Sequence, residues 1–275
     1  MMGFEEHMRV IVCGAGGRMG VRIIHAIKET QGVDLAAGVE RPGHPMLEKG
    51  LGQHAGLPEL KVPAVSDLGE VIDEADVVID FSSPEASMTN LHTAAKKGKP
   101  MVVGTTGIDS TQRKGFEAAG GRIAVCLSPN MSVGVNLLFS LVSQVANILG
   151  KEYDPEIVEI HHRMKKDAPS GTAVQLARIL AAARGWDLEK TGVYGRKGIT
   201  GPRHTEELGI HAVRTGDVVG EHTVIFGGPG ERIELVHRAH SRDTFAYGAL
   251  KAAFFVFQAE PGLYDMQDVL GLKGK

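Results

Sequence analysis

The sequence predicts an α/β protein with a doubly wound parallel sheet, followed by a second α+β domain with a mixed sheet. Strands and helices alternate through the first half of the chain, a pattern typical of parallel sheets. After about residue 130 the alternation is replaced by one long apolar helix and several strands separated by glycine-rich turns. The chain has 275 residues, of which 43% are hydrophobic, and this is enough for two ordinary domains.

The strands of the first half are short and apolar. We expect them at Arg9–Gly16, Val33–Glu40, Asp76–Asp80, Pro100–Val103 and Arg122–Leu127. Helices are expected at Arg18–Glu29, Ala86–Lys97 and Thr111–Ala119. Ser83 is of the residue type preferred at an N-cap, and Pro84 suits the first helical turn. A loop rich in glycine, proline and histidine is expected from Glu40 to about Leu60.

The second half has a different pattern. Helices are expected at Val133–Leu149 and Gly171–Arg184, and strands at Glu156–His162, His211–Arg214, Thr223–Gly227 and Arg232–His237. The last two strands flank a GGPG turn and are predicted to form a hairpin. The final helix, Thr244–Gln258, is apolar enough to pack back on the first domain.

Composition excludes several classes of partner. The net charge of −3 shows no basic excess, and aromatic residues are only 5% of the chain, so we expect neither nucleic acid nor an anionic membrane as a partner. Cys13 and Cys126 fall in apolar strands and are predicted to be free thiols in a reducing compartment. The first eight residues have an irregular, acidic composition unlike a signal peptide, and no apolar run is expected to approach the roughly 20 residues of a membrane span. A cytoplasmic protein is expected.

A glycine-rich turn, GAGGRMG, joins the first strand to the first helix. Gly14 allows the tight turn, while Gly16 and Gly17 let the backbone approach a pyrophosphate at the helix N-terminus. Gly20 lets the helix pack closely on the strand. Glu40 ends the second strand about 20 residues later, where an acid usually binds ribose hydroxyls. The pattern favours a Rossmann-like dinucleotide site over a turn without a ligand.

Cofactor choice is indicated by the residue after Glu40. An acid favours the free ribose of NAD, whereas an arginine such as Arg41 can pair with the 2′-phosphate of NADP. Both NADH and NADPH are therefore expected to bind. The alternative interpretation of Arg41 is a solvated loop arginine.

Two further loops are placed to complete the cofactor pocket. Gly104, Thr105 and Thr106 end the fourth strand, and ligands of open α/β sheets bind beyond the carboxyl ends of strands. The stretch Ser128–Ser132 ends the next strand at the domain junction and is predicted to form both a cofactor wall and a hinge. Either loop could instead be a plain turn.

The stretch EIHHRMKKDAPSGTA, Glu159–Ala173, combines cations with the start of a helix. His161 titrates near neutrality and could supply a proton, and Lys165 could polarise or protonate a substrate nitrogen. Backbone N–H groups around Gly171 and Thr172 could bind one carboxylate of a small dianion. No metal site is expected, because the adjacent histidines lack the spacing of zinc ligands. The alternative is a solvated basic loop.

At this point the chain resembles a known family. The motifs GAGGRMG, DFSSPEA, VVGTTG, SPNMSVGVN, EIHHRMKKDAPSGTA, GRKGITGPR, RTGDVVGEHTVIF and AHSRDTFAYGAL occur in the order seen in dihydrodipicolinate reductases. They extend from Arg9 to about Phe255. The chain departs from the family pattern at Met164, where many members have histidine, and at the additional Lys166.

The resemblance implies NAD(P)H-dependent reduction of 4-hydroxy-tetrahydrodipicolinate to tetrahydrodipicolinate in lysine and diaminopimelate biosynthesis. The residues implied to bind the cofactor are Gly14, Ala15, Gly16, Gly17, Arg18, Met19, Glu40, Arg41, Gly104, Thr105, Thr106, Ser128, Pro129, Asn130 and Met131. The catalytic residues would be His161 and Lys165, and the residues binding the dicarboxylate substrate would be His162, Gly171 and Thr172.

The resemblance also implies an organisation and an assembly. Residues 1–130 would form the dinucleotide-binding domain, completed by residues 242–275, and residues 131–241 would bind substrate and form a homotetramer through the sheets of this second domain. Two other functions stay open on the residues alone. One is another two-domain NAD(P)-dependent dehydrogenase, and the other is a non-catalytic NAD(P)-sensing protein.

Overall fold

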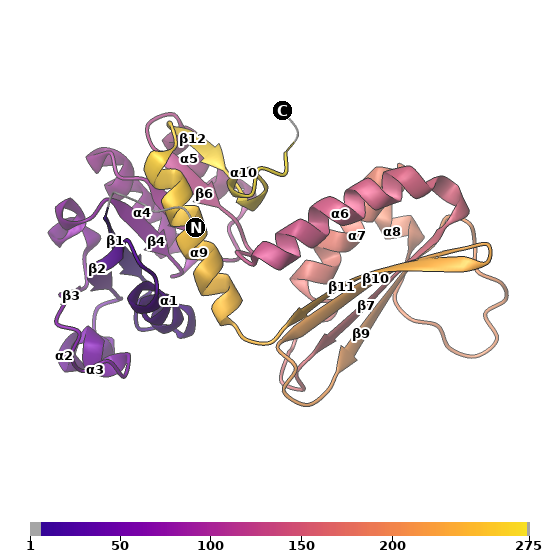
Figure 1. The fold of residues 1–275 in the computed structure, drawn as a ribbon, viewed down its shortest axis with the longest axis horizontal. Coiled ribbons are helices and arrows are strands. Elements are labelled where there is room, and N and C mark those ends of the chain that lie inside the picture. Colours follow the sequence, from indigo (N-terminus) through magenta and orange to yellow (C-terminus); the bar gives the residue numbers. More distant parts are fainter. Residues whose placement is uncertain (1–6, 274–275) are drawn as a thin grey trace. The chain divides into compact units, whose positions relative to one another are not determined.

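A computed structural model describes residues 7–273 and divides the chain into two compact units. The first unit extends to Val133 and resumes at Arg242, and the second is Gly134–Ser241 (Figure 1). Most of the irregular start expected for the first eight residues lies outside the described residues.

The first unit contains a seven-stranded sheet in which every pairing is parallel. Its strands, in spatial order, are β12 (Gly262–Tyr264), β6 (Ala124–Leu127), β5 (Met101–Val103), β4 (Val77–Asp80), β1 (Met8–Cys13), β2 (Val33–Val39) and β3 (Ala64–Val65). The chain proceeds from β1 to one edge and then returns to place β4 on the other side of β1. The expected doubly wound sheet is confirmed, and its switch point lies between β1 and β4.

Helices cover both faces of this sheet. Along β1, Val10 and Val12 point into a core shared with α1 (Arg18–Glu29) and α9 (Asp243–Gln258). Ile11 and Cys13 point into the opposite core, formed with α4 (Pro84–Lys97) and α5 (Ser110–Gly120). This alternation follows from the period of two in a strand. The expected return of the last helix is confirmed, because α9 contacts α1, β4, β5 and β6.

Local signals for helix ends also hold. The Ser83 side chain accepts a hydrogen bond from the backbone of Ala86, and Pro84 lies in the first turn of α4. Both cysteines are buried free thiols, and burial raises the pKa of Cys126 to about 12, so that thiol stays protonated.

Several short elements were not expected. The predicted loop from Glu40 to Leu60 contains two short helices, α2 (Pro45–Lys49) and α3 (Leu51–His54). Two 3₁₀ turns, η1 (Leu68–Glu70) and η2 (Ile72–Glu74), lie before β4. The C-terminal β12 and α10 (Met266–Val269) were also missed. Elements of two to five residues are too short to show a periodic apolar pattern, so only their tertiary contacts reveal them.

The second unit has a mixed five-stranded sheet, as expected. Its strands, in spatial order, are β11 (Glu231–Ala239), β10 (Gly220–Gly228), β7 (Asp154–His161), β9 (Leu208–Arg214) and β8 (Gly192–Val193). The predicted hairpin is formed by β10 and β11, whose antiparallel pairing continues as far as the pair Gly228 and Glu231. Strand β7 pairs in parallel with β9. The helices of this unit are α6 (Val133–Leu149), η3 (Gly150–Glu152), α7 (Gly171–Arg184) and α8 (Leu188–Thr191).

The helix formed by α6 and η3 corrects one expectation. Its 20 residues, Val133–Glu152, are long and apolar enough to cross a membrane, which was not expected from the sequence. Leu138, Val142 and Ala146 of this helix are buried in the core of the second unit beside residues of α7 and β7. Burial in this core accounts for part of the apolar character of the helix, whereas Leu137 and Ile148 are exposed at 43% and 80%.

Candidate active site

The glycine turn after β1 is shaped by close backbone contacts. Gly14 has a φ of +74°, and a Cβ there would lie 2.6 Å from the carbonyl oxygen of Phe81. A Cβ on Gly20 would lie 2.2 Å from the carbonyl oxygen of Gly14, so α1 can pack on the turn only with glycine there. Gly17 is the N-cap of α1, and its exposed backbone precedes the helix N-terminus.

Glu40 is brought directly to this turn. Its Oε2 atom accepts a hydrogen bond of 3.0 Å from the backbone N–H of Gly16, and Oε1 accepts one of 3.0 Å from the N–H of Arg41. The Arg41 side chain is exposed. A Cβ on Gly16 would collide with the His44 ring, which keeps this side of the turn narrow. A bare glycine cradle, a helix N-terminus and an acid at the end of β2 together fit a dinucleotide.

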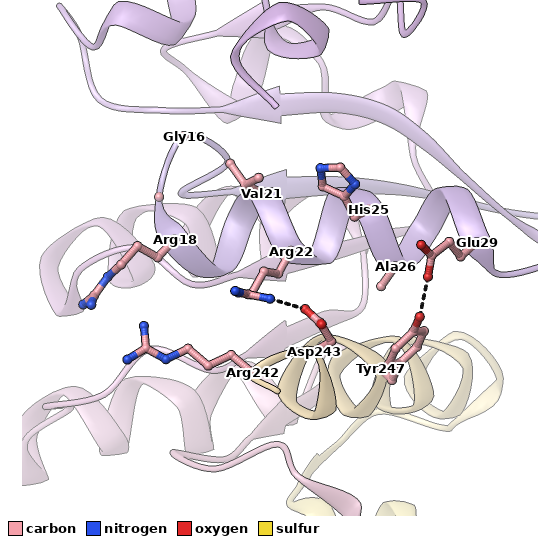
Figure 2. A pocket seen from close by; sticks show the side chains of 11 residues that line it. Gly16, Arg18, Val21, Arg22, His25, Ala26, Glu29, Arg242, Asp243 and Tyr247 are labelled. Carbon is pink, nitrogen blue, oxygen red and sulfur yellow. Dashed lines mark hydrogen bonds and ion pairs between the residues drawn. The ribbon is translucent and has the colours of Figure 1, made fainter. Parts of the chain in front are cut away.

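A pocket of about 660 Å³ extends from the glycine turn along α1 and α9 (Figure 2). Arg18 and Arg242 both line it, near the end at which Figure 2 labels Gly16. Within the pocket, Arg22 forms an ion pair with Asp243. The hydroxyl of Tyr247 donates a hydrogen bond to Glu29 at the other end of the pocket. Arg242 was not predicted as a site residue, because it is 224 positions after Arg18 in the sequence (242 − 18).

The loops after β4 and β5 are joined by one buried carboxylate. The Oδ1 atom of Asp80 accepts hydrogen bonds from the hydroxyls of Ser82, Ser87 and Thr105, at 2.6, 2.9 and 3.1 Å. Its Oδ2 atom accepts one of 2.7 Å from the side-chain amide of Asn90. Asp80 is fully buried, so these bonds replace the water that its charge would otherwise require.

This carboxylate fixes the side chain of one predicted cofactor residue in the turn after β5. The hydroxyl of Thr105 is committed to Asp80 and Ser87, and the residue is buried. Thr106 is exposed, and Gly104 packs so closely on Phe81 that a Cβ would lie 2.1 Å from the ring. The hydroxyl of Thr105 is therefore used within the protein.

The loop after β6 is held in a defined shape. Ser128 donates a hydrogen bond of 2.9 Å to the carbonyl of Asn130, whose side chain accepts one of 2.9 Å from the N–H of Ser132. A Cβ on Gly248 of α9 would lie 1.8 Å from the carbonyl oxygen of Met131, so the helix packs directly on this loop. Pro129 is exposed, whereas Ser128 and Met131 are buried. All predicted cofactor residues lie in the first unit.

The predicted catalytic and substrate residues gather in the second unit around Glu159. This glutamate is fully buried in β7, on the same face as His161 and the core residue Ile157. It accepts hydrogen bonds from Nδ1 of His161, from both terminal nitrogens of Arg214 at 2.8 and 2.9 Å, and from the backbone N–H of Ser170 at 3.0 Å. Burial pushes the pKa of Glu159 upward, but these hydrogen bonds outweigh it and hold the pKa below its ordinary value.

His161 is 8% exposed, and its environment works against its charged form. Burial is the largest effect and lowers the pKa of His161, and the charges of Lys165 and Arg214 lower it further. Glu159 opposes this shift but does not cancel it. Burial also lowers the pKa of His222 to about 3, so this neighbour, whose ring centroid is 5.2 Å from that of His161, is neutral near pH 7.

The remaining predicted residues lie on the loop after β7 and at the start of α7. The Nζ atom of Lys165 is 2.9 Å from a carboxylate oxygen of Asp167, and His162 is half-buried. The Ser170 side chain caps α7 by accepting from the N–H of Ala173. Gly171 begins the helix, and a Cβ there would meet no atom within 4 Å, so open space lies in front of its backbone.

Glu159, Arg214 and Asp167 were not assigned roles from the sequence. A signal existed for Glu159, because the alternation of β7 puts it on the face of His161. Arg214 carried no such signal, since it is on a different strand. Among residues 7–273, no group of three or more histidine, cysteine, aspartate or glutamate side chains is arranged to hold a metal ion.

Comparisons with known proteins agree over nearly the whole chain. Residues 8–131 match the family model described as dihydrodipicolinate reductase, N-terminus, and residues 134–270 match that described as dihydrodipicolinate reductase, C-terminus. The chain is 50% identical to a 4-hydroxy-tetrahydrodipicolinate reductase of Citrifermentans bemidjiense, over 97% of this chain and 100% of the relative. It is 52% identical to one of Syntrophotalea carbinolica over the same shares of both chains.

Solved structures show the same fold. A dipicolinate-bound dihydrodipicolinate reductase from Paenisporosarcina sp. TG-14 matches with a TM-score of 0.75 at 24% identity, over 95% of this chain and 98% of that chain. The matched relatives are reductases, so this chain is an oxidoreductase, and its family supports a nicotinamide cofactor. Within that class, this chain belongs to the dihydrodipicolinate reductase family.

Proposed function

We propose that this protein catalyses the NAD(P)H-dependent reduction of 4-hydroxy-tetrahydrodipicolinate to tetrahydrodipicolinate, a step of lysine and diaminopimelate biosynthesis. The observation that carries the proposal is the identity of about half of all residues with reductases of that name over essentially their full length. The stretch Glu159–Ala173 is compatible with the proposal, because Glu159 and His161 are buried and paired with each other and Lys165 is paired with Asp167.

The reaction requires one hydride, one proton and the release of water. When bound, the reduced nicotinamide supplies the hydride. The hydride is added at C4, and the 4-hydroxyl leaves with one proton as water. His161 is the proton donor in this proposal: its Nδ1 atom donates to Glu159, so in the charged ring the proton on Nε2 is the one given to the substrate. Lys165, held by Asp167, polarises or protonates the ring nitrogen of the substrate.

The substrate dianion has anchoring groups in the same unit. Gly171 and Thr172 begin α7, where the helix dipole and the orientation of the first backbone N–H groups favour a carboxylate. The open space in front of Gly171 supports its role as a contact for this carboxylate. His162 is assigned as a further substrate contact.

The cofactor is assigned to the first unit and to either NADH or NADPH. Gly14–Met19 would hold the pyrophosphate at the start of α1, with Glu40 on the adenine ribose and Arg41 on a 2′-phosphate. The turn after β5 and the loop Ser128–Met131 would complete the nicotinamide side. The exposure of Arg41 supports its role, because its guanidinium is available to a ligand.

Two wider features belong to the proposal. Residues 1–130 with 242–275 form the dinucleotide domain, and residues 131–241 form the domain for substrate binding and assembly. We assign a homotetramer built through the mixed sheet, whose face opposite α6 and α7 exposes Val213 and Val236 at 41% and 42%. The two buried free thiols favour a reducing, cytoplasmic location.

The deciding experiment is a coupled assay. Pyruvate and aspartate semialdehyde are condensed by the preceding synthase, and oxidation of NADPH or NADH is followed by absorbance. We expect oxidation only when the synthase and both of its substrates are present, with tetrahydrodipicolinate as the product. If the cofactor is not oxidised although the synthase product accumulates, the proposed reaction is wrong.

A further inference from the structure

We propose that Glu159 is a positioning residue for proton transfer: its buried carboxylate holds the proton of neutral His161 on Nδ1 and leaves Nε2 as the atom that exchanges a proton with substrate. The same carboxylate would align this ring with the loop of Lys165 and the start of α7. The inference rests on the proposed function, because it requires His161 as the proton donor.

The contacts of Glu159 define the tautomer. Its carboxylate faces three donor groups besides His161: the two terminal nitrogens of Arg214 and the backbone N–H of Ser170. A group surrounded by donors remains an ionised acceptor, so Nδ1 of His161 must donate to it. In the neutral ring, Nε2 then carries no proton and can accept a hydrogen bond. In the charged ring, Nε2 carries the proton that is transferred.

Glu159 is also linked to the start of α7 and to the loop that carries Lys165. Ser170, which donates its backbone N–H to Oε1, is the N-cap of α7, where the substrate carboxylate would bind. Arg214 donates hydrogen bonds to both carboxylate oxygens of Glu159 and a further one of 2.7 Å to the carbonyl of Asp167. The carboxylate of Asp167 in turn holds Lys165. One buried group therefore aligns the end of β7, the loop after it and the first turn of α7.

Stability alone does not explain this arrangement. A buried ion pair is costly to desolvate, and a well-packed apolar pair of the same volume stabilises a fold as well or better. Glu159 is fully buried, yet it retains its charge through the bidentate contact with Arg214. An apolar pair could not place a negative charge against the His161 ring.

Gly220 of β10 lies beside the other nitrogen of His161. A Cβ on Gly220 would lie 3.0 Å from Nε2, so any larger residue there would crowd this nitrogen. The charged groups that face the ring are Glu159, Lys165 and Arg214, and neutral His222 packs edge-on against it. Among these, only Glu159 favours the protonated ring, since both cations disfavour it.

The consequence is a pH profile with a defined direction. If protonated His161 is the donor, kcat/KM falls as pH rises through the His161 pKa. Glu159 raises that pKa, so removing its charge moves the falling limb to lower pH. In Glu159→Gln we expect a displacement of about one pH unit or more, the usual scale for a lost ion pair, and kcat lower by at least about tenfold.

Glu156 provides a matched control on the same strand. It is a partly buried glutamate of β7 that pairs with Arg196, Arg203 and His211, and none of its hydrogen bonds is to His161. Glu156→Gln should affect stability without moving the limb. Glu159→Asp keeps the charge and should leave the limb closer to wild type than Glu159→Gln does. If Glu159→Gln loses rate without moving the limb, or if both glutamines move it equally, the inference is overturned.

A measurement on the unmodified enzyme covers the case in which Glu159→Gln does not fold. The ¹⁵N shifts of His161, assigned by their loss in His161→Ala, distinguish the two neutral tautomers. We expect Nδ1 to carry the proton, and a proton on Nε2 would overturn the inference. Wild-type activity in the coupled assay is recorded in parallel, so that failure of the proposed function is distinguished from failure of this one.

Discussion

Arg41 directly follows the acid that ends β2, and its exposed guanidinium is the group assigned to a 2′-phosphate. Arg41→Ala should weaken NADPH binding by about 10- to 100-fold, corresponding to the ~1.5–3 kcal/mol of a charge-assisted hydrogen bond. NADH binding should change little, because its ribose carries no phosphate. Dissociation constants from cofactor fluorescence test this, with exposed Lys49→Ala as the control. Equal losses for both cofactors would contradict the assignment.

His161 and Lys165 differ from the neighbouring cations in being partly buried and paired with acids. His161→Ala and Lys165→Ala should each lower kcat by at least about 10²-fold, the lower end of general acid–base catalysis. NAD(P)H affinity should be unchanged, since both residues lie outside the first unit. Lys166→Ala, an exposed neighbour, is the control for simple loss of charge. Near-normal turnover of either variant would mean that the loop is only a solvated basic surface.

At the scale of elements, the start of α7 is predicted to anchor one substrate carboxylate. Gly171→Val should fold normally, because a Cβ there meets no neighbour, but its side chain should obstruct the approach of an anion to the backbone N–H groups. Pyridine-2,6-dicarboxylate should inhibit the wild type competitively and should inhibit Gly171→Val much less. Thr172→Val should show a milder loss, since the backbone donors remain.

The comparison ligand for this test is pyridine-2-carboxylate, which has only one of the two anchors. A pocket with two clusters of donors should bind the dicarboxylate much more tightly than the monocarboxylate. Equal inhibition by the two compounds in the wild-type enzyme would rule out the two-anchor pocket.

In the parallel sheet, hydrogen bonds to the buried carboxylate of Asp80 connect β4 to α4 and to the turn after β5. Asp80→Asn should lower the free energy of unfolding by about 1–3 kcal/mol, because its amide would face the amide of Asn90 with donors on both sides. The double variant Asp80→Asn with Asn90→Asp restores a donor opposite an acceptor. Chemical unfolding should therefore show partial recovery in the double variant. If the double variant loses as much free energy of unfolding as the two single variants added together, this pairing is wrong.

At the scale of the whole molecule, the outer face of the mixed sheet is assigned to assembly. Val236→Glu places a charge on the face that exposes Val213 and Val236, where burial of an unpaired charge in an interface would be costly. We expect sedimentation velocity to show a tetramer for the wild type and smaller species for the variant. Arg178→Glu, at an exposed position of α7, is the control and should keep the tetramer. A wild-type monomer, or an unchanged mass for Val236→Glu, would refute the assignment.

Much of the molecule could be predicted from local patterns. The strand–helix alternation and the capping residues before α4 depend only on neighbouring positions, and they appear as expected. The glycines of the first turn were interpretable because the steric need for Gly14 and Gly20 arises within one strand–turn–helix unit. The order of motifs along the chain was sufficient to place it in its family.

The sequence by itself thus determined the fold class and the family, and it predicted His161, Lys165 and Gly171 as site residues. Only the tertiary structure decided how these groups are held. The ion pair of Glu159 with Arg214 spans 55 positions, and Arg18 lines one pocket with Arg242 of the last helix. Such contacts join elements that are distant in the chain, and a local pattern contains no record of them. They arise because strand pairing and helix packing bring distant side chains together, and burial then requires each charge to find a partner.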